Sequence, residues 1–157
     1  MNVIGGYFSQ GPCAGRFEFW TRVSLPRSKA KHPRKTAGER ADGHGVKPEE
    51  VGRIDANCFL SFVWHLTGRP EGAPDGWRRE RLLEIPLDHY SVHKCERVEE
   101  EKPLLEAADI HLFPLPSYSP ERSDIEPVWQ DVKHHELTKR SHDRLGTLLQ
   151  EVSSALL

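Results

Sequence analysis

The spacing of apolar residues changes several times along this chain of 157 residues, and each change marks a predicted element. Near the start, residues 2–9 and 16–24 are rich in aromatic and β-branched side chains, which favour β-strands. Glycine and proline lie between the two runs and signal a turn. The pattern therefore predicts a β-hairpin.

Helical spacing dominates three later regions. Over 50–67, apolar residues recur as they do on one face of an amphipathic helix. Residues 94–109 have a helical composition, but Pro103 lies among them and predicts that a second helix begins there. Towards the end of the sequence, the spacing i, i+3, i+4, i+7 predicts helices at about 124–137 and 142–156.

Two more strands and two loops complete the prediction. Short apolar runs predict strands over 81–88 and 110–115, although Pro86 cannot donate a hydrogen bond to a strand ladder. Residues 68–80 are a predicted loop, and the polar, proline- and glycine-containing segment 26–49 is a predicted disordered insertion. The order of elements predicts an α/β fold with a mixed sheet.

The distribution of charge along the chain is more informative about function than the net charge. The chain is long enough for one domain, and its formal net charge of −2 does not by itself indicate a nucleic-acid binder. Positive charge is concentrated over 22–35, where no acid interrupts Arg22, Arg27, Lys29, Lys31, Arg34 and Lys35. This basic segment is either a solvated loop or a loop that contacts phosphate.

Cysteine usage and hydropathy bear on the compartment. The three cysteines form no C-x-x-C pair, which favours reduced thiols over a disulfide scaffold. No apolar run approaches the roughly 18 residues of a membrane span, and no signal peptide is visible. We therefore expect a cytoplasmic protein.

Two acids stand where phosphodiester chemistry could use them. Asp88 ends the apolar run 81–88, and Glu126 lies in the first turn of a predicted helix. Mg²⁺ prefers carboxylate oxygens, and a pair of such ions can activate a nucleophile and stabilise a leaving oxygen. Both acids also have a structural interpretation, because Ser123 to Glu126 matches the capping box S-x-x-E and aspartate is common at strand ends and turns.

The residues near Asp88 and Glu126 give little further evidence for a catalytic or metal-binding site. His93 and Cys95 could suggest a zinc ligand pair, but no second pair lies at zinc-finger spacing. Trp129 falls on the apolar stripe of its helix and is predicted to pack in the core. Tyr118, between two prolines, is predicted to brace the loop before Glu126.

Two longer motifs resemble a known family. L-D-H-Y-S-V-H, from Leu87 to His93, is similar to the second acidic motif, approximately L-D-N-x-x-x-H, of DDE transposases of the mariner superfamily in their bacterial insertion-sequence branch. Their third motif reads approximately L-P-x-Y-S-P-E-L-N-x-I-E-x-x-W-x-x-x-K. It is matched without gaps by Leu115, Pro116, Tyr118, Ser119, Pro120, Glu121, Ile125, Glu126, Trp129 and Lys133. The resemblance covers about half the chain, from about 82 to 149.

The resemblance implies an RNase H-like domain in which Asp88 and Glu126 are the second and third metal-binding acids. It implies Mg²⁺ (or Mn²⁺) as cofactor, and DNA, both transposon ends and target, as substrate. Cleavage would use water and joining a DNA 3′-hydroxyl as nucleophile. His89 and Ser123 replace asparagines of the family motifs, which changes hydrogen bonding around the metal rather than its ligands.

The family's first catalytic aspartate lies on a central strand before the hairpin, and neither that strand nor the family's helix-turn-helix domain is recognisable in 1–157. We therefore expect a partial RNase H-like catalytic domain that is poorly stable and inactive alone. Its partner would be the missing amino-terminal part or a second transposase subunit. A decayed element, a frameshifted second reading frame and a misassigned start each explain such a chain.

Two alternatives stay open. The chain could be a non-catalytic transposase remnant that at most binds DNA through its basic segment. It could also be an unrelated α/β interaction domain in which Asp88 and Glu126 serve structure only.

Overall fold

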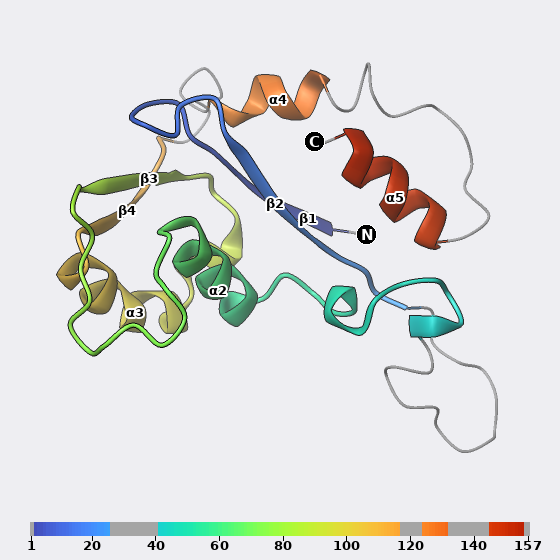
Figure 1. Ribbon diagram of the computed structural model, residues 1–157, viewed down its shortest axis with the longest axis horizontal. Helices are drawn as coiled ribbons and strands as arrows, with labels where there is room; N and C mark the ends of the chain where they lie inside the picture. Colours follow the sequence, from blue (N-terminus) through green and yellow to red (C-terminus); the bar gives the residue numbers. More distant parts are fainter. Residues whose placement is uncertain (1, 26–40, 117–123, 132–144, 156–157) are drawn as a thin grey trace. The chain divides into compact units, whose positions relative to one another are not determined.

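The computed structural model describes residues 2–25, 41–116, 124–131 and 145–155 (Figure 1). The chain divides into two compact units. The first contains Met1–Arg53 and Pro127–Leu157, and the second contains Ile54–Glu126. None of the helices in the described ranges is long and apolar enough to cross a membrane.

The first unit begins with the predicted hairpin. Strand β1, Asn2–Tyr7, pairs antiparallel with β2, Phe17–Arg22, and Gly5 lies opposite Phe19. The turn between them is closed by two backbone hydrogen bonds joining Phe8 to Gly15 and Arg16, at 2.7 and 2.9 Å. The hairpin prediction is confirmed.

Part of the segment predicted to be disordered is folded. Residues 41–46 form a turn in which the Val46 N–H donates to the Ala41 carbonyl at 3.1 Å, and Pro48–Glu50 forms a 3₁₀ turn. Ala41 and Val46 are buried, at 0% and 4% exposure. The prediction is therefore wrong for 41–49, because Val46 packs against residues far away in the sequence, whereas 26–40 lie outside the described residues.

Helices α4, Ile125–Asp131, and α5, Leu145–Ala155, pack against this hairpin region. One apolar cluster joins Val23 and Val46 to Leu149 of α5, with Val51 beside it. A second cluster surrounds Val152 and contains Val3, Phe17, Phe19, Trp129 and Leu148. Trp129 thus packs in the core, as predicted from its helical stripe.

The second unit is built around a parallel pair of strands. Strand β3, Leu83–Leu87, pairs with β4, Ile110–Pro114, and helix α3, Glu96–Ala107, forms the crossover between them. Parallel strands require such a crossover, and a helix usually supplies it. Helix α2, Ala56–Leu66, lies with α3 on one side of the pair (Figure 1). The buried residues of this unit are Phe59, Leu60, Phe62, Val63, Leu87, Val98, Leu105, Ala108 and Ile110, together with Thr67.

Helix α2 begins later than the apolar pattern predicts. Asp55 is its N-cap, and its carboxylate accepts the Cys58 N–H at 2.9 Å. Such a side chain satisfies one of the backbone donors that a helix start leaves unpaired. Residues 50–55, which sequence spacing included in the helix, therefore precede it.

Helix α3 runs unbroken through Pro103, so the predicted second helix is wrong. An internal proline costs about 3 kcal/mol because it removes a donor and crowds the preceding turn. Val98 and Leu105 lie two turns apart on the same face of α3, and both are fully buried. Burying two such side chains contributes about 3–6 kcal/mol, enough to keep one continuous helix.

Pro86 is compatible with β3 because of its position in the ladder. The Leu83 N–H donates to the Asp109 carbonyl at 2.9 Å, and the Leu87 carbonyl accepts the Leu115 N–H at 2.8 Å. Odd-numbered residues of β3 therefore turn their backbone polar groups towards β4. Pro86 faces the other way, so its missing N–H removes no hydrogen bond from this ladder.

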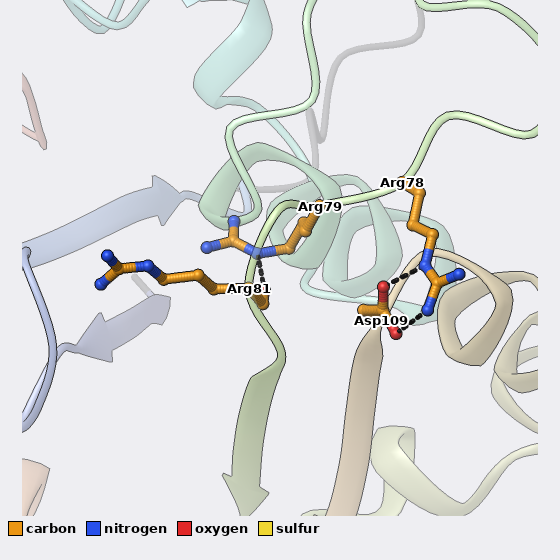
Figure 2. Close-up of polar contacts among 4 residues, drawn as sticks. All are labelled: Arg78, Arg79, Arg81 and Asp109. Atoms are coloured by element: carbon orange, nitrogen blue, oxygen red, sulfur yellow. Dashed lines mark hydrogen bonds and ion pairs between the residues drawn. The ribbon is translucent and has the colours of Figure 1, made fainter.

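The long loop before β3 is fastened at the opposite end of the strands from Asp88. The Arg78 guanidinium contacts both carboxylate oxygens of Asp109, and the Arg79 Nε donates to the Arg81 carbonyl at 3.2 Å (Figure 2). The Arg79 N–H also donates to the Ala108 carbonyl at 3.2 Å. These contacts attach the loop to the turn between α3 and β4.

The α/β class is therefore confirmed, and the single mixed sheet is not. Within the described ranges, the strands form two separate sheets of two strands each, one antiparallel and one parallel. Pairing between strands far apart in the chain is a tertiary property that the apolar pattern of each strand does not encode.

Candidate functional site

Asp88 directly follows β3, at the carboxyl end of the parallel pair. Ligands in open α/β sheets bind at this end of the strands. The chain then turns through Tyr90 into a short 3₁₀ helix, Ser91–Lys94, before α3 begins. Asp88 thus lies at the end of a strand, as its place at the end of the apolar run 81–88 predicts.

The two oxygens of the Asp88 carboxylate have different surroundings. Oδ1 accepts the Tyr90 N–H at 3.0 Å and lies 3.0 Å from Nδ1 of His93. Within the described part of the chain, Oδ2 has no hydrogen-bond partner. The Asp88 side chain is 66% exposed. Asp88 therefore serves as a turn residue, as the structural interpretation predicted, and still offers one free oxygen.

The surroundings favour the ionised form of Asp88. The hydrogen bond from His93 lowers the pKa of the Asp88 carboxyl below its ordinary value, against the opposing effect of partial burial. The Tyr90 N–H and the positions of His93 and His89 lower the pKa further. An ionised carboxylate at neutral pH is the form that binds a hard cation.

His89 occupies the position where the resembling family has asparagine. Its Nδ1 lies 2.7 Å from Nζ of Lys94, an interaction between exposed side chains. Because an ammonium group can only donate, Nδ1 of His89 accepts in this contact and carries no proton. The substitution therefore links His89 to Lys94, while Tyr90 and His93 hold Asp88.

Glu126 is the second residue of α4 and is half-buried. Its carboxylate makes no hydrogen bond or ion pair within the described ranges. Trp129, one turn further along α4, packs edge-to-face on Phe17 with the ring centroids 5.4 Å apart, which fastens the helix to the hairpin. The predicted capping partner, Ser123, and the predicted loop brace, Tyr118, lie outside the described residues.

The role of His93 was not predicted from the sequence, where a zinc pair with Cys95 lacked a second pair and His93 was matched only to the family motif. In the structure, Nδ1 of His93 contacts Asp88. Among the residues that the structure describes, no group of three or more histidines, cysteines or acids is placed to hold a metal ion. The five-residue separation, bridged by a 3₁₀ turn, is the signal that could have paired His93 with Asp88.

The match to known families decides the class of this chain. A family model described as DDE superfamily endonuclease matches residues 51–149, more than half of the sequence. This chain belongs to the DDE superfamily endonucleases. The matched region contains both Asp88 and Glu126, whereas the hairpin β1–β2 precedes it. Neither the curated proteins nor the solved structures gave a significant match.

Family membership assigns the general chemistry of this DDE domain. It indicates nuclease or transposase activity on DNA, and DDE superfamily endonucleases generally use divalent metal ions. The small α/β architecture with two short sheets is compatible with such a nuclease. Asp88 fits a hard cation, because it combines a lowered pKa, an anchored Oδ1 and an unpartnered Oδ2.

Proposed function

We propose that this DDE domain is the carboxyl-terminal catalytic part of an insertion-sequence transposase of the mariner superfamily. Asp88 and Glu126 would together hold Mg²⁺ or Mn²⁺ for DNA cleavage and strand transfer. The observation that carries the proposal is the Asp88 carboxylate, held at the end of β3 by two donors on one oxygen and free on the other.

A bound Mg²⁺ ion would supply activation of the attacking oxygen and charge stabilisation at the leaving oxygen. The residues of this chain would position the two carboxylates that bind the ion. The Tyr90 N–H and His93 hold Oδ1 of Asp88, so that Oδ2 is left for the ion. Glu126 comes from the first turn of a helix that Trp129 packs against the hairpin. Each acid would therefore come from an element that is itself packed, which supports the proposal of a metal site.

The same family resemblance implies three acids, of which these 157 residues match two. We infer that DNA cleavage needs a third carboxylate supplied from outside them, and that the chain alone is inactive. In the described ranges, each strand of the two sheets pairs on one side only, which leaves edges where a further strand of an RNase H-like fold could pair. DNA phosphates would meet the basic segment at 22–35.

Iron-mediated backbone cleavage tests whether the two acids share an ion. Fe²⁺ replaces Mg²⁺ in oxygen-ligand sites, and with ascorbate and peroxide it releases hydroxyl radicals that cut the backbone nearby. The full 157-residue chain is expected to be cut near both 88 and 126. D88N and E126Q should each abolish both sets of cuts, because each removes a ligand of the same ion.

The matched controls are two exposed acids on the same elements, Glu84 on β3 and Asp131 on α4. E84Q and D131N are expected to leave both sets of cuts unchanged. Cuts confined to one region, or cuts that survive D88N, would contradict the shared site. Salt-sensitive DNA binding without such cuts would instead support the non-catalytic remnant.

A further inference from the structure

We infer that His93 is a positioning residue that fixes the Asp88 carboxylate, so that Oδ1 is held by the protein and Oδ2 is presented to the metal ion. This inference rests on the proposed function and deepens it.

One nitrogen atom of His93 contacts both the side chain and the backbone of Asp88. Nδ1 of His93 lies 3.0 Å from the Asp88 carboxylate oxygen Oδ1 and 3.2 Å from the Asp88 backbone carbonyl oxygen. A donor shared between a residue's carbonyl and its carboxylate restricts the χ1 rotation that connects them. The Tyr90 N–H, also on Oδ1, restricts the same rotation from a second direction.

The imidazole ring is itself held in place. It is 13% exposed and packs against the ring of Phe59, with the ring centroids 4.4 Å apart at an interplanar angle of 40°. Phe59 belongs to α2 and is only 3% exposed. The Tyr90 ring contacts His93 edge-on with the centroids 5.8 Å apart. The core of the second unit thus fixes the donor.

A purely structural role does not account for this arrangement. Water could solvate a carboxylate that is 66% exposed, and exposed ion pairs contribute only about 0–1 kcal/mol to stability. Packing against Phe59 needs only an apolar ring. What the Nδ1 contact adds is orientation of the carboxylate, and loss of such contacts around a metal ligand typically costs about 10–100-fold in metal affinity.

The contact also assigns the proton on the ring. A backbone carbonyl oxygen can only accept, so Nδ1 of His93 carries a hydrogen. In the neutral ring, Nε2 is then unprotonated, and nitrogen-15 chemical shifts at one fixed pH distinguish this tautomer from the opposite one. The tautomer is a readout that needs neither DNA nor catalysis.

Three variants of the full 157-residue chain separate orientation from packing. H93N places an amide donor close to the position of Nδ1, H93Q places its amide near Nε2, and H93F keeps an apolar ring against Phe59 without a donor. Mn²⁺ binding is followed by paramagnetic broadening of the Tyr90 amide signal, and the free energy of unfolding is measured by urea denaturation. Three-bond couplings report whether Asp88 keeps a single χ1 rotamer.

We expect H93F and H93Q to weaken Mn²⁺ binding about 10–100-fold and to average the Asp88 rotamer. H93N should restore most of the affinity and the single rotamer. Equal Mn²⁺ binding by all three variants, or an averaged Asp88 rotamer in the unmodified chain, would overturn the inference. Affinity losses that follow the losses of stability in every variant would also overturn it, because they indicate packing alone.

Failure of the proposed function gives a different result. In that case Mn²⁺ would not broaden the Tyr90 signal of the unmodified chain, or D88N would leave the broadening unchanged. That result would overturn the metal-directed part of the inference together with the proposed function. Binding that D88N abolishes but H93F does not affect would overturn the role of His93 alone.

Discussion

Gly5 of β1 lies so close to Trp129 of α4 that a Cβ atom on Gly5 would be 2.8 Å from Cζ2 of the indole. The same atom would lie 2.8 Å from Cζ of Phe17. Real Cβ contacts are essentially never that short, so the aromatic rings occupy the space that a side chain at residue 5 would need. This approach packs the helix that carries Glu126 against the hairpin.

Replacing Gly5 with alanine should therefore destabilise the protein. Inserting a methyl group into a well-packed cluster typically costs about 1–3 kcal/mol, and G5V should cost more than G5A. The measurement is the free energy of unfolding by urea denaturation. In the background W129L, which removes the indole, G5A should cost less, although Phe17 keeps the relief partial. Equal costs of G5A in both backgrounds would contradict the contact.

Replacing Gly146, in the first turn of α5, with alanine should change stability in the opposite direction to most such replacements in helices. Alanine in place of a helical glycine ordinarily stabilises by about 0.5–1 kcal/mol. Here, a Cβ atom would lie 2.5 Å from the Gly45 carbonyl oxygen, and the Gly146 N–H donates to the His44 carbonyl at 3.1 Å. Because the obstructing atoms belong to the backbone, G146A should destabilise the protein and separate α5 from the turn at 41–46.

The exposed neighbour Thr147 supplies the control for this substitution. T147A should change the free energy of unfolding by less than about 0.5 kcal/mol, since the Thr147 side chain is exposed. Urea denaturation of both variants checks the prediction. A stabilising effect of G146A would show that α5 does not approach the turn so closely.

The Arg78–Asp109 pair predicts a pH dependence of stability. The hydrogen bond from Arg78, with its positive charge, lowers the pKa of the Asp109 carboxyl below its ordinary value of 3.8. A group whose pKa is lowered by folding stabilises the folded state above its unfolded pKa and loses that contribution as pH falls through the folded pKa. Wild type should therefore be more stable than D109N at pH 6, and the difference should vanish in strong acid.

Asparagine suits this comparison because residue 109 has a φ of 60°, a left-handed conformation that asparagine and aspartate tolerate. D109N therefore removes the charge without adding backbone strain. The control is D75N, since Asp75 is exposed and makes no hydrogen bond or ion pair in the part of the chain that the structure describes. Urea denaturation across pH 2–7 measures the difference, and a pH-independent difference between wild type and D109N would contradict the prediction.

Local patterns determined most of the elements. The aromatic and β-branched residues and the turn signals of residues 2–24 predicted the hairpin, and the apolar runs around 81–88 and 110–115 predicted β3 and β4. The motif around Asp88 placed that acid at the end of a strand, where the structure has it. These features depend on residues close together in the chain, so the sequence alone carries them.

The tertiary structure decided the features that depend on distant partners. Burial of Val46 against Val23 and Leu149 orders a segment whose composition predicts disorder. Burial of Val98 and Leu105 carries α3 through Pro103.

The contact between His93 and Asp88 also depends on a residue that is distant in the chain. It depends on a 3₁₀ turn after β3 and on packing of the imidazole against Phe59, which precedes His93 by 34 positions. The sequence by itself thus determined the family motifs, the α/β class and the position of Asp88 along its strand. Only the folded chain decided which side chain holds its carboxylate, because that contact is made by burial between elements and not by spacing within one.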